Sequence, residues 1–162
     1  MDNSKDSDFR TVRGYQLANR RDGQLTPAME DYLEMSYRLC EENDYARVGQ
    51  LSGLLHVRAS SASKMISKLS DLGYLKYDRY EIIQLTDSGR DMGRYLLERH
   101  ETVESFLTMI DSPHALEETE LIEHSLSPST VSNLSVFIKF FQADESARKS
   151  FESFKKKKEK GS

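Results

Sequence analysis

The stretch that decides the fold is residues 60–73, SSASKMISKLSDLG. Its apolar residues recur every three or four positions, as they do on the buried face of a helix, and they are Ala62, Met65, Ile66, Leu69 and Leu72. The opposite face carries serine hydroxyls and two lysines, and Gly73 can take the left-handed conformation that ends a helix. This stretch therefore predicts a short amphipathic helix with one polar face in solvent.

Signals on either side of this helix predict its neighbours. Thr26-Pro27 is a capping hydroxyl followed by a proline at the first helical position, and the helical pattern behind it ends near Glu42. A shorter helix is expected over 48–55. Two strands are expected over 74–77 and 82–85, joined by a hairpin tip at 78–81. Helix, short helix, helix and hairpin, in that order, indicate a winged helix-turn-helix.

The C-terminal half is expected to be all helical. Thr86-Asp87-Ser88 caps a long helix that ends near Ile110. Ser112-Pro113 and Ser127-Pro128 are two further cap-plus-proline starts, which predict helices over 113–125 and 128–141, and a last helix is expected over 144–154. The predicted fold class is therefore mainly α with a small β-hairpin.

About fifty residues cannot bury all the apolar side chains of this half. Those in question are Leu121, Ile122, Leu126, Leu134, Val136, Phe137, Phe140 and Phe141. Burial between two copies predicts a homodimer, and packing against the chain's own N-terminal half is the alternative. The predicted organisation is a flexible arm (1–24), a winged helix-turn-helix domain (25–94), a helical metal-binding and dimerisation domain (95–154) and a basic tail (155–162).

Composition excludes several classes of protein. The chain has 162 residues, 37% of them hydrophobic and 31% charged, which is too apolar for a wholly disordered chain. No run of about eighteen apolar residues and no secretory signal is present, so a cytoplasmic protein without a membrane partner is expected. The single cysteine, Cys40, excludes an internal disulfide and a Cys-x-x-Cys metal site.

The net charge of −4 argues at first against a nucleic-acid partner, but the charge is unevenly placed. Residues 47–79 hold six basic and two acidic side chains, and residues 100–145 hold nine acidic side chains and one lysine. The first segment has the charge to face a phosphate backbone. Two functional halves are therefore expected.

Three groups of potential metal ligands stand at helical same-face spacing. Asp31 and Glu34 lie three residues apart, His100 stands one turn before Glu104, and a third group is Glu120, Glu123 and His124. A solvated helix face is the alternative for the carboxylate pair, and a surface or core position is the alternative for His100. Four carboxylates and two imidazoles, with no cysteine among them, favour a hard divalent ion such as Mn²⁺.

Several stretches of the chain carry a family resemblance in matching order and spacing. They are TPAMEDYLE (26–34), YARV (45–48), SSASKM (60–65), LTDSG (85–89), RHE (99–101) and ELIEH (120–124). From Leu25 to about Lys149 the chain resembles the diphtheria-toxin-repressor family, and in particular its manganese-responsive branch, the manganese transport regulators. The resemblance implies a Mn²⁺-dependent transcriptional repressor rather than an enzyme, and manganese uptake genes as its targets.

The resemblance also implies a paired-metal site, with two Mn²⁺ per subunit and Fe²⁺, Co²⁺, Cd²⁺ or Zn²⁺ as substitutes. Its ligands would be Asp31, Glu34, His100, Glu120, Glu123 and His124. The iron-responsive branch typically has methionine in place of Asp31 and cysteine in place of Glu120, so the carboxylates here favour manganese. Many members carry a second histidine where this chain has Ser125, which is therefore not counted as a ligand.

The expected partner is double-stranded DNA with a palindromic operator. The residues expected to approach it are Arg47, Arg58, Ser60, Ser61, Ser63, Lys64, Lys68 and Arg79. In the hypothesis for activation, carboxylates repel one another in the empty site and leave the winged helix mobile. Shared coordination of metal then fixes the two reading heads about one DNA turn apart.

Two other function classes remain open. A helical binuclear metallohydrolase would use the same carboxylates and imidazoles with a metal-activated water, and it would need a substrate cleft. A winged-helix regulator that senses an organic ligand would leave the acidic groups as ordinary surface. Hydrolase activity with Mn²⁺, and the effect of Mn²⁺ on operator binding, discriminate between these classes.

Overall fold

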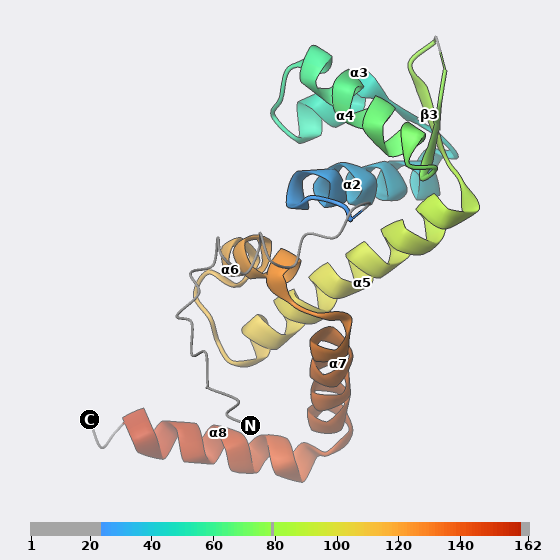
Figure 1. Ribbon diagram of the computed structural model, residues 1–162. Coiled ribbons are helices and arrows are strands. Elements are labelled where there is room, and N and C mark those ends of the chain that lie inside the picture. Colours follow the sequence, from blue (N-terminus) through green and yellow to red (C-terminus); the bar gives the residue numbers. More distant parts are fainter. Residues whose placement is uncertain (1–23, 79, 160–162) are drawn as a thin grey trace, which may run out of the picture.

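The computed structural model describes residues 24–78 and 80–159. The N-terminal arm up to residue 23 and Arg79 lie outside the described residues. Figure 1 shows the arrangement of the elements, which in chain order are α2 (Pro27–Asn43), β1 (Ala46–Arg47), α3 (Val48–Leu54), α4 (Ala59–Asp71), β2 (Leu75–Tyr77), β3 (Ile82–Leu85), α5 (Asp87–Met109), α6 (Ala115–Ile122), the 3-10 turn η1 (Glu123–Ser125), α7 (Pro128–Ala143) and α8 (Glu145–Glu159).

The N-terminal half is a winged helix-turn-helix, as the sequence predicts. The Thr26 hydroxyl accepts a hydrogen bond from the Met29 amide and caps α2. Helix α4 ends next to Gly73, whose φ of 84° is the expected left-handed stop. Side chains from α2, α3, α4, β3 and α5 form one core, whose fully buried members include Leu33, Leu51, Ile66, Ile83 and Leu96.

The sheet has one strand more than predicted. Its order is β1-β3-β2 with both pairs antiparallel, and β1 consists of only two residues, paired with Ile82 and Ile83 of β3. A two-residue strand is too short to show the alternation by which strands are recognised. The short strand ties the segment between α2 and α3 to the hairpin, and Arg47 is thereby placed at the edge of the wing.

Helix α5 connects the two halves. Its first turns pack against α2, and its later turns meet α6, η1 and α7 (Figure 1). Gly93 makes the approach to α2 possible, because a Cβ there would lie 2.5 Å from the Cβ of Tyr37. Leu96, one turn further on, is fully buried in the core of the N-terminal half. The position of α2 on α5 therefore depends on a residue without a side chain.

The predicted helix over 113–125 is wrong at both ends. Helix α6 begins at Ala115, and the Ser112 hydroxyl donates a hydrogen bond to Glu118 instead of capping a helix that starts at Pro113. The α-helical part ends at Ile122, and residues 123–125 form the tighter 3-10 turn η1. Leu126 is already extended before Ser127, which caps α7, so there is no room for another α-helical turn.

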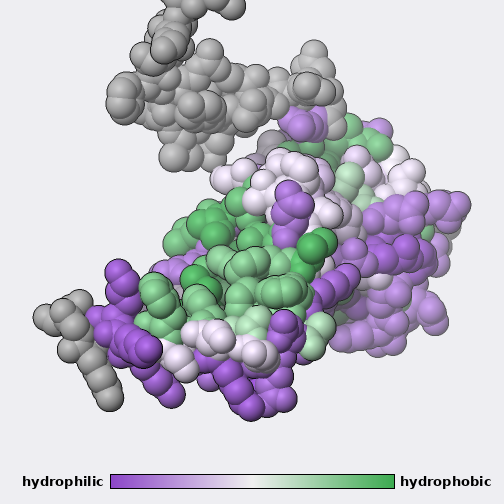
Figure 2. Space-filling model, turned by 90° about the horizontal axis from the view of Figure 1, so that it is seen from below, coloured by the Kyte–Doolittle hydropathy of each residue, from purple (hydrophilic) through white to green (hydrophobic). Residues whose placement is uncertain are grey.

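The last two helices leave apolar side chains in solvent. Helix α7 runs as predicted from Pro128, whereas α8 continues into the lysine run beyond the predicted end at 154. Figure 2 shows apolar side chains gathered on the face seen from below. The large exposed apolar side chains of α6, α7 and α8 are Leu116, Leu121, Ile122, Val136, Phe137, Phe140, Phe151 and Phe154. No helix among the described residues has the length and apolar character needed to span a membrane.

The close contact between α2 and α5 gives a first prediction. Gly93→Ala should lower the free energy of unfolding by about 1–3 kcal/mol, because the added methyl meets the stem of the Tyr37 side chain, which has no freedom to move aside. Urea denaturation measures the change. Gly53→Ala in α3, where an added Cβ meets nothing within 4 Å, is the matched control and should be neutral or slightly stabilising. Equal stability of the two variants would contradict the packing argument.

Candidate metal centre

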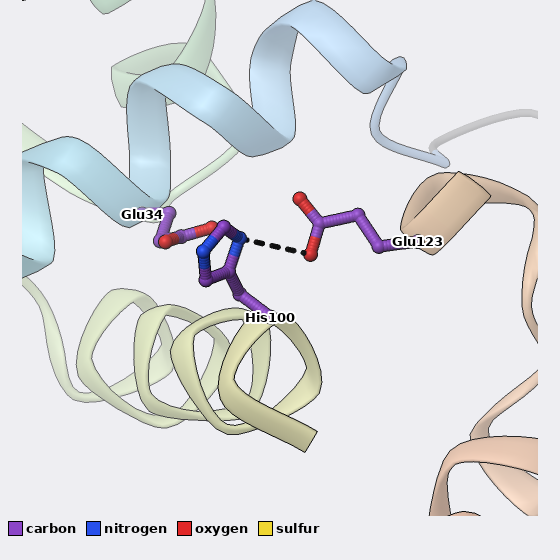
Figure 3. Close-up of side chains that lie close together, drawn as sticks. All are labelled: Glu34, His100 and Glu123. Carbon is purple, nitrogen blue, oxygen red and sulfur yellow. Dashed lines mark ion pairs between the residues drawn. The ribbon is translucent and has the colours of Figure 1, made fainter. Parts of the chain in front are cut away.

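Three buried ligand-type side chains meet where α2, α5 and η1 come together. Figure 3 shows Glu34 reaching from α2, His100 from α5 and Glu123 from η1 toward a common point. One ligand atom of each lies within 4.8 Å of the other two. The three residues come from segments far apart in the sequence, so only the folded chain assembles this group. A carboxylate–imidazole–carboxylate set of this kind suits a divalent cation with a preference for oxygen and nitrogen.

Glu123 lies at the middle of the site. Its side chain is 1% exposed, and its Oε2 has no hydrogen-bond partner within the described part of the chain. Oε2 lies 3.4 Å from His100 Nδ1, and Oε1 lies 3.8 Å from His124 Nε2. The two oxygens therefore face two different imidazoles. A buried carboxylate oxygen without a donor is a position that a cation would satisfy, so the residues present fit a metal.

His124 joins the first group to α2. Its Nε2 lies 3.1 Å from Asp31 Oδ1, and its Nδ1 lies 2.6 Å from Glu30 Oε2. Hydrogen bonds with Asp31 and Glu30 raise the pKa of His124 to about 9, against the opposing effect of burial. The imidazole is therefore held as a cation between two carboxylates of α2 at neutral pH. A metal at Nε2 requires the loss of that proton.

Glu120 lies at the rim of the site. Its Oε1 is 3.7 Å from His100 Nδ1, but its side chain is 56% exposed. Partial desolvation raises the pKa of Glu120, and the neighbouring carboxylates act in the same direction. The expectation that Glu120, Glu123 and His124 share one face of an α-helix is wrong, because α6 ends between the first and the second. The 3-10 turn buries Glu123 and leaves Glu120 in solvent.

The structure brings all six predicted ligands into one connected group. Asp31 reaches it through His124, Glu120 reaches it through His100, and the centre is the buried trio of Figure 3. The Glu123 carboxylate, together with the charges of Glu34 and Glu120, raises the pKa of His100. Both imidazoles thus carry charge more readily than usual, which offsets part of the repulsion among the carboxylates.

Three residues of the site were not predicted from the sequence. Arg99 is 3% exposed, donates to Glu30 through Nη2 at 2.8 Å and has its Nε 3.8 Å from Glu123 Oε2. Burial opposes the charge of Glu30, but hydrogen bonds with His124 and Arg99 lower the pKa of its carboxyl. Arg38 donates two hydrogen bonds to Oε1 of Glu34. The one available signal was position: Glu30 lies four residues before Glu34, and Arg38 four after it.

The residues predicted to face DNA lie at the end of the molecule formed by α3, α4 and the hairpin, apart from the metal centre (Figure 1). They occupy α4, the residue before it and the edge strand β1 (Figure 1), and exposed among them are Arg47, Arg58, Ser60, Ser61, Lys64 and Lys68, while Ser63 is half-buried. Arg79, predicted for the wing, lies outside the described residues. The guanidinium of Arg47 lies 5.5 Å from the centre of the Tyr45 ring. Apart from Arg79, the set therefore forms an open polar and basic surface.

Comparison with protein families gives two matches that together span most of the chain. Residues 24–82 match the family model described as "Iron dependent repressor, N-terminal DNA binding domain". Residues 86–152 match "Iron dependent repressor, metal binding and dimerisation domain". The second match contains η1 and the part of α5 that carries His100, and the first contains α2 and α4.

Curated relatives match over nearly their whole length. The HTH-type transcriptional regulator MntR of Bacillus velezensis is 40% identical over 136 residues, which are 83% of this chain and 96% of the relative. The protein of the same name from Bacillus subtilis is 39% identical over the same shares of the two chains. The MntR protein of Listeria welshimeri is 44% identical over 119 residues, which are 72% of this chain and 84% of the relative.

Solved structures show the same fold in longer proteins. The manganese regulator SloR is 28% identical with a TM-score of 0.62, and the match covers 72% of this chain and 55% of that one. The metal-dependent transcriptional regulator MtsR is 27% identical with a TM-score of 0.63, over the same shares. A manganese-dependent transcriptional repressor in complex with manganese is 28% identical with a TM-score of 0.60, and the match covers 69% of this chain and 53% of that one. This chain thus spans little more than half the length of each.

The environment of His124 predicts how stability depends on pH in the presence of a chelator. Because the fold raises the pKa of His124 from 6.5 to about 9, its stabilising effect is complete below pH 6.5 and is lost as the pH rises toward 9. Urea denaturation across this range should show a falling free energy of unfolding, with a smaller fall for His124→Gln. His114→Gln, at an exposed histidine outside the ligand group, is the control and should follow the parent. If the free energy of unfolding of His124→Gln fell with pH as steeply as that of the parent, His124 would not be the source of the pH dependence.

Proposed function

The chain belongs to the iron dependent repressor family of transcriptional regulators, and we propose from that premise that it is a manganese-dependent repressor of manganese uptake genes. It is a metal-dependent, DNA-binding transcriptional repressor that acts as a homodimer. The observation that carries the choice of metal is the ligand set: carboxylates and imidazoles with no thiolate or thioether among them. Action on chromosomal DNA in the cytoplasm follows from the same proposal.

We propose Asp31, Glu34, His100, Glu120, Glu123 and His124 as the metal ligands. The two oxygens of Glu123 face different imidazoles, which supports two ions per subunit, and this carboxylate would help to hold both. Bound divalent cations would supply the positive charge that the carboxylates need to share one site. Fe²⁺, Co²⁺, Cd²⁺ and Zn²⁺ accept the same donor atoms and are the substitutes to compare with Mn²⁺.

Coupling to DNA binding follows from the elements that carry the ligands. Asp31 and Glu34 are on α2, which packs against the core under α4, whereas Glu123 and His124 follow α6 in the C-terminal half. Ligands shared across this junction would hold α4 in one orientation relative to the second copy. We propose a palindromic operator, because a dimer presents two equivalent recognition helices. The exposed apolar side chains of α6, α7 and α8 support assembly of two copies through this end.

A hydrolase remains the less favoured function. The ligand group lies among packed helices, and the cavity of about 620 Å³ between α5 and α7 is lined by Arg99 but by none of the six proposed ligands. The family consists of transcriptional regulators. We therefore propose that the metal serves regulation and not catalysis, and a Mn²⁺-loaded protein should show no phosphoesterase or peptidase turnover.

The metal dependence of repression is tested at Glu123. Glu123→Gln keeps the size of the side chain but replaces a charged ligand by a neutral amide, so Mn²⁺ affinity should fall by more than about 100-fold, beyond the loss typical of outer partners. DNA affinity measured by fluorescence anisotropy should then no longer rise with Mn²⁺. Glu117→Gln on the exposed side of α6 is the matched control and should behave like the parent. Side-by-side titrations with Mn²⁺ and Fe²⁺ give the metal preference.

The DNA surface is tested at Lys64. Lys64→Glu should weaken binding to all DNA sequences by about tenfold or more at fixed salt, and the slope of log affinity against log salt should fall by about one unit. Lys156→Glu makes the same change of charge on α8, at the opposite end of the molecule from α4 (Figure 1), and should have little effect. Equal losses in the two variants would show that net charge, and not this surface, determines binding.

A further inference from the structure

His124 has a second partner besides the groups of the proposed metal centre. Glu30 Oε2 lies 2.6 Å from Nδ1 of the ring, on the side away from Asp31, which faces Nε2 at 3.1 Å. Glu30 and Asp31 are neighbours on α2, so one helix contacts both ring nitrogens. The carboxylate at Nδ1 does not belong to the buried trio and is not among the proposed ligands.

Arg99 fixes the position of that carboxylate. Its Nη2 donates a hydrogen bond of 2.8 Å to the same oxygen, Glu30 Oε2, and its side chain is 3% exposed. The distance from Arg99 Nη2 to His124 Nδ1 is 3.1 Å. A guanidinium can only donate, so it cannot bond to a ring nitrogen that carries a proton. Both donors instead share the Glu30 oxygen, which joins α2, α5 and η1 at one atom.

This arrangement determines which ring nitrogen is available to a cation. A carboxylate that accepts from Nδ1 keeps the proton on that nitrogen, and the lone pair of the neutral ring is then on Nε2. Nε2 faces Asp31 and Glu123, which are both proposed ligands. We propose that Glu30, held by Arg99, is the positioning residue that directs Nε2 of His124 into the metal centre. This inference rests on the proposed metal-dependent function and adds a residue outside the ligand set.

The test compares two variants of Glu30 with one variant of another carboxylate on α2. Glu30→Ala removes the acceptor, Glu30→Gln keeps an oxygen that can accept from Nδ1 but loses the charge, and Glu42→Ala removes an exposed carboxylate from the same helix as the matched control. Mn²⁺ affinity is measured by electron paramagnetic resonance of the free ion. We expect a loss of about 10- to 100-fold for Glu30→Ala, a smaller loss for Glu30→Gln and none for Glu42→Ala.

A second measurement uses the protein in the presence of a chelator. In long-range ¹H–¹⁵N spectra, the Nδ1 proton of His124 should exchange slowly with water in the parent and rapidly in Glu30→Ala. If Glu30 served only to stabilise the fold, its removal would not selectively speed the exchange of this proton. Glu30→Gln is nearly isosteric, so it keeps the test decisive if Glu30→Ala fails to fold.

The outcomes separate this inference from the proposed function. A parent that binds no Mn²⁺ would overturn the proposed function itself. A parent that binds Mn²⁺ while Glu30→Ala binds it within about twofold as tightly would overturn only the role of Glu30. Equal losses in Glu30→Gln and Glu30→Ala would also overturn it, because the hydrogen-bond acceptor would then be irrelevant.

Discussion

The buried charge of Glu123 is the constraint on which the surrounding structure depends. A carboxylate that is 1% exposed needs donors or cations close by, because the cost of burying an isolated charge is large. His100 and Arg99 approach its Oε2 at 3.4 and 3.8 Å, which is too far for good hydrogen bonds, and the atom has no other partner in the described chain. The fold therefore holds a negative charge that its own side chains balance only in part, and a divalent cation would complete the balance.

The same constraint joins the two halves of the molecule. Glu123 belongs to the C-terminal half, but the groups around it include Glu34 and, through His124, Asp31 on α2. One face of α2 thus meets the ligand group, while Leu33 on its other side lies in the core shared with α4. Gly93 lets α2 lie directly on α5, so α2 has little freedom to move without disturbing that contact. The ligand group and α4 are therefore connected through one helix, α2, and not through a chain of loops.

The sequence predicted those parts of the fold that are determined locally. Thr26, Thr86 and Ser127 cap their helices through their own hydroxyls, so the starts of α2, α5 and α7 were correct. Ser112 has the same appearance in the sequence but donates to Glu118, and α6 begins only at Ala115. Strand β1 depends on pairing with β3, and the place of Arg99 depends on its contacts with Glu30 and Glu123. These contacts join distant segments of the chain, so no local sequence pattern contains them. Helical spacing and family resemblance predicted that these six residues belong together, but not their separation into a buried centre and an exposed rim.

The contacts of His124 change the expectation that an empty site is dominated by repulsion. Asp31 and Glu30 already hold the imidazole between them, and Arg99 adds a further cation, so α2 and η1 are linked by protein side chains alone. A metal ion held by Asp31 and His124 would replace the proton that now lies between them, because Nε2 cannot bind a proton and a metal ion at once. The free energy that couples metal binding to DNA binding would then be the difference between two attractive arrangements, one held by the proton and one held by the metal. It should have the size usual for allosteric coupling, about 1–3 kcal/mol, and not the much larger energy of relieving bare repulsion among carboxylates.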